Sequence, residues 1–273
     1  EMPYNWKTSV DAFNETYHVV ATHPELTSWL EDLDIQIDIY DKHNRYIVPF
    51  GTPSSHLEDK KTISDDLRLY MEQAGIDSSN FKGDATEVRR AIQIQRREHG
   101  AEMGYDFSEL NDDQLSDDFH YLIFPNITLN IYPESMMLFR QRPHPTDPNK
   151  SFFDLQNYLM QPGASIPGVM DNKDISGTKN EERENSKDEV SRKRRMGGTY
   201  QEVPTEIERP SHRQFKHGEE SLGVVLDQDA YNLPHVQKGM NSDGYEGLWL
   251  GTQEIRIRHF HQTIDDYVFK NKR

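Results

Sequence analysis

Apolar positions near both ends of this 273-residue chain recur every three or four residues, the spacing of one face of a helix. The first such stretch predicts a helix that starts at Trp6 and is ended by Pro24. Its apolar face contains Trp6, Val10, Phe13, Tyr17 and Val20, and its opposite side carries Asp11, Glu15 and His18. The last such stretch predicts an amphipathic helix from about Thr252 to Lys270. Its apolar stripe contains Ile257, Phe260, Ile264, Tyr267 and Val268.

Short runs rich in β-branched and aromatic residues replace the helical pattern in the middle of the chain. The runs "HYLIF", "ITLNIY", "SMMLFRQR" and "SFFDLQNYL" are separated by turn-forming segments that contain Pro. They predict an antiparallel meander from about Phe119 to Leu159. Further along, the run "LGVVLDQDAYNLPHVQKGM" is interpreted as a buried strand that leads into a short helix, with Pro234 in the first turn.

Two long segments differ from their surroundings. Residues 57–110 have a mainly helical pattern, in which Ser64 can cap one helix and Asp84 with Glu87 has the capping-box spacing before another. We interpret them as an insertion. Residues 161–221 are rich in charge, Gly, Ser and Pro, which predicts a polar, flexible segment whose "RKRR" run is solvated. We therefore expect a single α+β domain over residues 1–273, with the antiparallel sheet curled around the C-terminal helix.

The charge balance excludes several classes of partner. The chain has 31 basic and 47 acidic side chains and a net charge of −16, which repels nucleic acid and anionic membrane surfaces. It has no apolar run of membrane-spanning length and no signal-peptide pattern, which favours a cytoplasmic location. It also has no cysteine. A metal site in this chain would therefore rest on His, Asp and Glu side chains.

The first predicted helix contains the candidate chemistry. Its two histidines, His18 and His23, are five positions apart, and Glu15 precedes the first by one helical turn. Five residues of ideal helix rotate by about 140°, so the rings converge only if the helix loosens before Pro24. Two imidazoles with one carboxylate from elsewhere are typical of non-haem Fe(II) oxygenases. The alternative is a polar, solvated helix face. His120 is interpreted as a core histidine.

Three stretches together resemble the catalytic domain of the α subunit of Rieske-type aromatic-ring-hydroxylating oxygenases. They are "NWKTSVDAFNETYHVVATHPEL", "FHYLIFPNITLNIYPE" and "VLDQDAYNLPHVQKGM...GTQEIRIRHFHQTIDDYV". The family pattern is an acid, two residues, His, four residues and His, which Glu15, His18 and His23 match. The resemblance implies the helix-grip fold. It also implies that His18, His23 and Asp229 bind iron, that Glu15 relays electrons, and that Asp11, Phe13 and Asn14 line the substrate pocket.

The third iron ligand has two alternatives. The resemblance places it at Asp229, eight residues before Gln237. Asp227 is a rival, because two positions along an extended segment would give it the same direction. His235 is a weaker alternative.

The implied activity is that of a terminal oxygenase in the catabolism of aromatic compounds. Fe(II) would activate O2 and an apolar, aromatic substrate would be hydroxylated once or twice. Electrons would come from a ferredoxin or reductase through a Rieske [2Fe-2S] cluster, in a homotrimer. Because the cluster needs cysteines that this chain lacks, we expect either a fragment of a longer polypeptide or a lone domain that cannot receive electrons in the usual way. The alternative is a metal-free helix-grip module that binds an apolar ligand. A metal-dependent hydrolase is disfavoured, because no separate general base is apparent.

Overall fold

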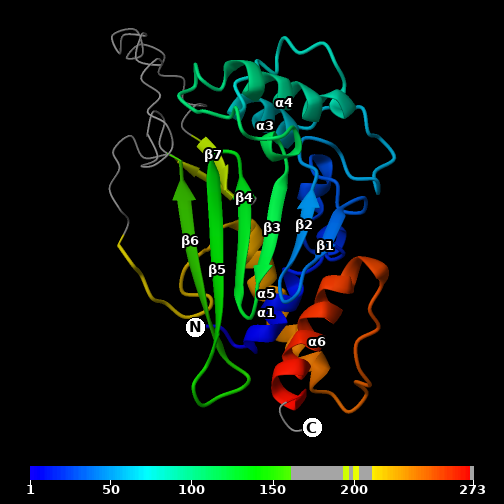
Figure 1. The fold of residues 1–273 in the computed structure, drawn as a ribbon, viewed down its shortest axis with the longest axis vertical. Coiled ribbons are helices and arrows are strands. Elements are labelled where there is room, and N and C mark those ends of the chain that lie inside the picture. Colours follow the sequence, from blue (N-terminus) through cyan, green and yellow to red (C-terminus); the bar gives the residue numbers. More distant parts are fainter. Residues whose placement is uncertain (161–192, 197–198, 203–210, 271–273) are drawn as a thin grey trace.

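A six-stranded antiparallel sheet forms the centre of the molecule (Figure 1). The computed structural model describes residues 1–160, 193–196, 199–202 and 211–270. Sheet order follows chain order, so each strand pairs with the next one along the sequence. The strands are β1 (Gln36–Ile39), β2 (Asn44–Val48), β3 (Asp118–Ile123), β4 (Ile127–Tyr132), β5 (Ser135–Pro143) and β6 (Ser151–Leu159).

The four strands of the predicted meander are confirmed as β3 to β6. The first two strands were not predicted. β1 and β2 have only four and five residues, and β1 is polar at Gln36 and Asp38, so the pattern of a half-buried strand is too short to recognise. β1 pairs with β2, and β2 pairs with β3, which extends the sheet and places Asn44 opposite Leu122.

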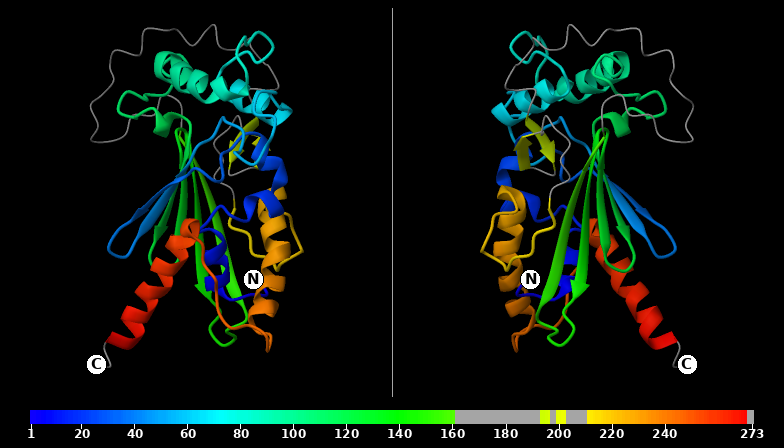
Figure 2. Two further views of the ribbon diagram at one scale, coloured as in Figure 1. Left: turned by 90° about the vertical axis from the view of Figure 1, so that its right-hand side faces the viewer. Right: turned by 90° about the vertical axis from the view of Figure 1, so that its left-hand side faces the viewer.

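One face of the sheet is covered by three helices, α1 (Trp6–Ala12), α5 (Val224–Met240) and α6 (Ile255–Phe269). Val10 of α1, Leu122 of β3 and Phe260 of α6 form one buried cluster. Leu226 of α5 packs on Phe139 of β5 in a second cluster. The predicted α+β class is confirmed. The helix α1 from the start of the chain (blue) lies beside α5 (yellow-orange) from its last third (Figure 2).

The C-terminal helix contacts the sheet through its first half. Thr252–Glu254 form a 3-10 turn, η5, and α6 continues to Phe269, close to the predicted bounds. Ile257 and Phe260 are buried, but Tyr267 and Val268 are 52% and 49% exposed. The predicted apolar stripe is therefore packed only over its N-terminal part. Arg256 is also buried there, where its Nε and Nη2 bond to Asn44 and His120.

His120 is a core histidine, as predicted. It is fully buried, and its Nδ1 lies 2.9 Å from Arg256 Nη2. Its Nε2 has no hydrogen-bond partner among the described residues. Burial and the charge of Arg256 hold the pKa of His120 well below its ordinary value, so the ring is neutral.

The predicted insertion is helical and lies beyond one end of the sheet (Figure 1). It contains α3 (Asp65–Gln73), the 3-10 turn η2 (Ala85–Glu87) and α4 (Val88–His99), and η3 (Asp113–Leu115) follows it. Both predicted caps are present: Ser64 accepts a hydrogen bond from Leu67, and Asp84 with Glu87 forms a capping box. The helices of the insertion thus have N-terminal caps formed by residues of the insertion itself.

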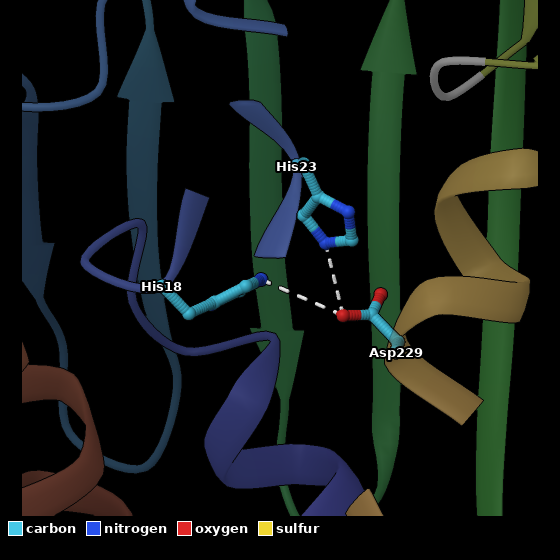
Figure 3. Close-up of side chains that lie close together, drawn as sticks. All are labelled: His18, His23 and Asp229. Carbon is cyan, nitrogen blue, oxygen red and sulfur yellow. Dashed lines mark hydrogen bonds and ion pairs between the residues drawn. The ribbon is translucent and has the colours of Figure 1, made fainter. Parts of the chain in front are cut away.

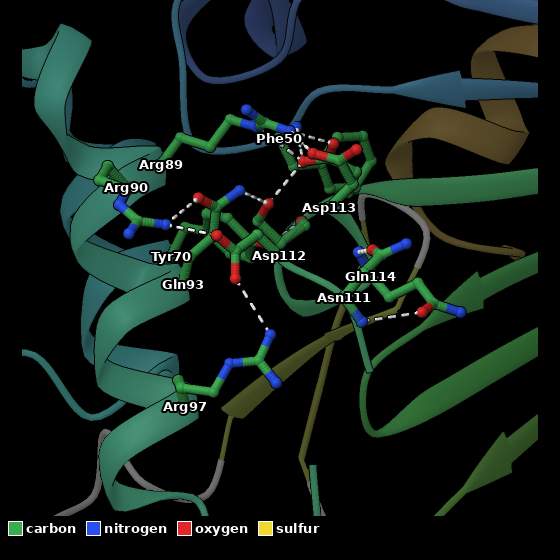
Figure 4. A network of polar contacts seen from close by, with 12 residues as sticks. Phe50, Tyr70, Arg89, Arg90, Gln93, Arg97, Asn111, Asp112, Asp113 and Gln114 are labelled. Carbon is green, nitrogen blue, oxygen red and sulfur yellow. Dashed lines mark hydrogen bonds and ion pairs between the residues drawn. The ribbon is translucent and has the colours of Figure 1, made fainter. Parts of the chain in front are cut away.

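Arginines of α4 form ion pairs with aspartates of the segment that leads into β3 (Figure 4). Arg90 and Arg97 both bind Asp112, at 2.6 and 3.0 Å, and Arg89 binds Asp113 at 2.7 Å. Arg96 is buried, and its Nη2 lies 2.8 Å from Glu134 Oε1 at the β4–β5 turn. An ion pair between a buried arginine and a half-buried glutamate therefore links the insertion to the sheet.

Most of residues 161–221, for which flexibility was predicted, lie outside the described residues. Within that segment the backbones of β7 (Lys193–Met196) and β8 (Thr199–Glu202) pair as an antiparallel hairpin. None of the helices in the described parts of the chain is long and apolar enough to cross a bilayer.

Candidate metal centre

The first helix ends at Ala12, so the prediction of one helix running to Pro24 is wrong. The chain then leaves the helical conformation, and two side chains of this turn form hydrogen bonds that a continuous helix would not contain. Thr16 Oγ1 donates to the backbone oxygen of Asp32 at 2.7 Å, and the Glu15 carboxylate accepts the backbone N–H of His18 at 2.9 Å. These bonds compete with the helical ladder. A second helix, α2 (Val19–Thr22), follows.

Glu15 also holds the ring of His18. Its Oε1 lies 2.6 Å from His18 Nδ1, and Glu15 itself is 8% exposed. A carboxylate can only accept, so the bond places a hydrogen on Nδ1 and leaves the Nε2 lone pair available.

The two histidines flank α2 at its two caps, His18 before it and His23 after it. The backbone of His23 leaves the helical region at φ −128° and ψ 54°, and Pro24 begins a new 3-10 turn, η1 (Pro24–Ser28). The ring centroids lie 5.1 Å apart. The non-helical backbone at His23 therefore removes the 140° divergence expected of one ideal helix.

Residues 224–240 form one 17-residue helix, α5, so the prediction of a strand followed by a short helix is wrong. Pro234 lies inside this helix. Proline lacks the N–H that would bond to the carbonyl four residues before, here Ala230. His217 Nε2 lies 3.0 Å from that oxygen and supplies the missing donor. An external hydrogen bond thus lets α5 continue past the proline.

The helix also separates the two rival acids. Asp227 accepts from Ser221 Oγ and, at 2.8 Å, from the backbone N–H of Leu222, at the start of α5. Two positions on a helix rotate by about 200°, so Asp229 points the other way, toward the histidines. The expectation that both acids share a direction is wrong. His235 is exposed and packs beside the ring of Tyr231.

Three side chains from the two ends of the chain converge at one point (Figure 3). Asp229 Oδ1 lies 3.0 Å from His23 Nε2 and 3.6 Å from His18 Nε2. The three candidate ligand atoms all lie within 4.8 Å of one another. His23 and Asp229 are buried, whereas the His18 side chain keeps 24% exposure.

The donor set fits a divalent transition metal. Two ligands bound at about 2.1 Å with angles near 90–110° lie roughly 3.0–3.4 Å apart, close to both observed separations from Asp229. Among the described residues this is the one His/Asp/Glu group with such spacing. Two imidazoles and one carboxylate form the facial triad of non-haem Fe(II) sites, which leaves coordination positions open. The group can therefore hold a metal.

Electrostatics around the group favour a cation. Burial lowers the pKa of His18, but the hydrogen bond and charge of Glu15 and the charge of Asp229 outweigh it, so this pKa lies above its ordinary value. Burial and the charge of Asp229 also raise the pKa of the Tyr4 phenol. The charge of Asp229 contributes to both shifts, which is the effect of a negative potential at this point.

A small apolar cavity adjoins Asp229. It has room for one water-sized body, ≈ 10 Å³, and is lined mainly by apolar side chains, among them Tyr4, Phe13, Phe153 and Leu226. Of the three predicted pocket residues, Phe13 lines this cavity and packs on Phe139 and Phe153.

The other two predicted pocket residues do not line the cavity. Asp11 instead faces His261 of α6, whose Nε2 lies 3.0 Å from both of its carboxylate oxygens. Asn14 is fully buried, and its side-chain amide has no hydrogen-bond partner among the described residues.

Two residues whose contacts the sequence did not reveal hold the group in place. Gln228 Oε1 lies 2.6 Å from His23 Nδ1. Gln237 Oε1 accepts from the backbone N–H of Asn5 at 2.8 Å and from Thr8 Oγ1 at 3.0 Å, which ties α5 to the start of α1. Because both bonds join positions more than 200 residues apart, spacing could not reveal them.

Comparison with known proteins gives the family. The family model described as "Ring hydroxylating alpha subunit (catalytic domain)" matches residues 1–270. The chain therefore belongs to the catalytic domains of ring-hydroxylating oxygenase α subunits, a family of non-haem iron oxidoreductases. The Rieske domain is not in this chain. A search of curated proteins gave no match.

Two similar solved structures come from quaternary ammonium Rieske monooxygenases. One is CntA in complex with the inhibitor MMV12, with 14% identity, a TM-score of 0.44, and coverage of 98% of this chain and 47% of that chain. The other, described with insights into carnitine oxidation by gut microbiota and inter-subunit electron transfer, has 14% identity, a TM-score of 0.48, and coverage of 98% and 48%. The chain spans about half the length of these structures.

Proposed function

We propose that this chain is the mononuclear iron domain of a terminal oxygenase that hydroxylates an apolar, aromatic substrate. The observation that carries the proposal is the convergence of His18, His23 and Asp229, from segments 206 positions apart, in a chain of this family. When bound, Fe(II) supplies the one-electron chemistry that activates O2. The surrounding residues orient the three metal ligands. They exclude water on the side of the apolar cavity and leave the edge of His18 open to solvent.

Each ligand has a separate support. Glu15 fixes the His18 ring, and the backbone turn before α2 fixes Glu15. Asp229 is carried by α5, which Gln237 ties to α1. The supports of His18 and Asp229 therefore come from different segments, and His23 is held by Gln228 of α5. This is the pre-organisation that an open metal site requires.

The site has a closed side and an open side. The closed side is the apolar cavity next to Asp229, whose ≈ 10 Å³ is far smaller than an aromatic ring, so substrate entry requires cavity side chains such as Leu222 to move. The open side is the exposed edge of His18, flanked by Tyr17 and Val20 at 67% and 40% exposure. We assign substrate to the first side and electron entry through Glu15 to the second.

Electrons would come from a Rieske [2Fe-2S] cluster outside this chain, reduced by a ferredoxin or reductase. An aromatic substrate fits the Phe13 and Phe153 rings at the cavity wall. A homotrimer that brings a neighbour's cluster to the exposed edge of His18 would complete the path. The competing function is a metal-free module that binds an apolar ligand in the same cavity.

Metal analysis after anaerobic loading with Fe(II) tests the proposal. We expect one iron per wild-type chain, and loss of stoichiometric iron without unfolding in His18→Ala and Asp229→Asn. Asp227→Asn is the matched control, because the same change two positions away leaves all three ligands in place. Wild-type protein that takes up no iron but binds an apolar ligand would support the metal-free module. Full iron in Asp229→Asn would contradict the ligand assignment.

A further inference from the structure

The ring of His23 is held at both of its nitrogens by neighbouring residues of one helix. Gln228 Oε1 lies 2.6 Å from Nδ1, and Asp229 Oδ1 lies 3.0 Å from Nε2. Consecutive residues of a helix point about 100° apart, so the two side chains reach opposite edges of the ring. His23 is 2% exposed, which leaves water little access to either nitrogen.

The contact with Gln228 fixes which nitrogen carries the hydrogen. A neutral imidazole has one N–H and one lone pair, and an amide oxygen can only accept. Gln228 Oε1 therefore requires the hydrogen on Nδ1. In this neutral ring the lone pair then lies on Nε2 and faces the Asp229 carboxylate, which also can only accept, so a cation between the two atoms is what joins them. This is the only neutral form of His23 that can share a metal with Asp229.

We propose that Gln228 is a positioning residue, which holds His23 in the tautomer and ring orientation needed for metal binding. The inference rests on the proposed function, because it concerns the same metal. Without Gln228 the hydrogen can move to Nε2, where the Asp229 carboxylate attracts it. The ring would then present an N–H to the metal position.

The two histidines differ in the charge of their supports. Glu15 is a carboxylate behind His18, whereas Gln228 is a neutral amide behind His23. Glu15 and Asp229 contribute two carboxylates, so a divalent ion balances the formal charge of the group. A glutamate at position 228 would keep the acceptor but add one negative charge. Two substitutions, Gln228→Met and Gln228→Glu, therefore separate the effect of the hydrogen-bond acceptor on metal binding from the effect of the added charge.

The experiment titrates the full chain with Co(II), whose visible absorption reports coordination geometry. Gln228→Met removes the acceptor at nearly constant shape, and we expect Co(II) affinity to fall by about 10- to 100-fold with an altered spectrum. Gln228→Glu keeps the acceptor and should bind at least as tightly as wild type. Gln262→Met, the same change at an exposed position of α6, is the matched control and should not differ from wild type.

Each outcome distinguishes this inference from the proposed function. Wild-type affinity and spectrum in Gln228→Met would overturn the positioning role while leaving the metal site intact. Equal loss in Gln228→Met and Gln228→Glu would also overturn it, because the glutamate retains the acceptor. Wild-type protein that binds neither Co(II) nor Fe(II) would instead refute the proposed function. Melting of the metal-free variants confirms that each one is folded before the titration is interpreted.

Discussion

Replacing Gln237 tests how the two ends of the chain are held together. Its Oε1 accepts the backbone N–H of Asn5 and the hydroxyl of Thr8, and its Nε2 donates to Asn149 Oδ1 at 2.9 Å. Gln237→Leu removes all three bonds at similar volume. It also leaves the Asn5 N–H, at the N-cap of α1, without its acceptor.

The magnitude follows from the burial of the three bonds. The two bonds to Oε1 are part-buried, and each contributes about 1 kcal/mol to the free energy of unfolding. The exposed bond to Asn149 contributes little. We therefore expect Gln237→Leu to lower the free energy of unfolding by roughly 2 kcal/mol, which corresponds to a fall in melting temperature of about 4–8 °C in a chain of this size.

Urea unfolding of the metal-free protein, followed by circular dichroism, measures the loss. Gln237→Glu is the control, because its carboxylate keeps both acceptor contacts and lacks only the exposed donor. We expect this variant to lie within about 0.5 kcal/mol of wild type. A Gln237→Leu variant as stable as wild type, or equal losses in both variants, would refute the reasoning that the two Oε1 bonds join α5 to α1.

Two further predictions concern charged groups away from the site. Arg96→Met should lower the free energy of unfolding by about 3 kcal/mol, because it leaves the half-buried Glu134 carboxylate without its cation. Adding Glu134→Gln should recover part of this loss in urea titrations. The hydrogen bond from Arg142 holds the pKa of Asp154 below its ordinary 3.8, so its contribution to stability is full above that pH and lost as the pH falls through the lowered pKa. Asp154→Asn should therefore be less stable than wild type at neutral pH, and this difference should shrink in urea titrations from about pH 5 down to pH 3. A difference that is constant with pH would contradict the lowered pKa.

Local patterns predicted the elements whose stabilisation is local. The caps at Ser64 and at Asp84 with Glu87 lie within three residues of their partners, and both were found where the sequence placed them. The meander was recognisable because each of its strands pairs with its neighbour in the chain. The sequence therefore predicted the sheet centre and the insertion well.

Elements that depend on distant contacts were predicted wrongly. Pro234 suggested a helix start, but His217, outside the helix, replaces the hydrogen bond that proline cannot make. The first helix stops early because Thr16 bonds to Asp32 on a later segment. Neither partner is visible in the spacing of the helix itself. The same reason explains why the contacts of Gln228 and Gln237 were not predicted, although Asp229 was named as a ligand.

Assembly of the candidate site and docking of α5 are one physical event. His18 and His23 lie on a segment that is already close to Glu15 in sequence, so that half of the site can form locally. Asp229 joins it only when α5 packs against α1, a step stabilised by Gln237 at one end of α5 and by the His23 contacts at the other. A metal that binds only the completed site stabilises the docked helix by its own binding free energy. The histidine pair alone is therefore a half-site, and the fold completes it by bringing the C-terminal part of the chain to the N-terminal part.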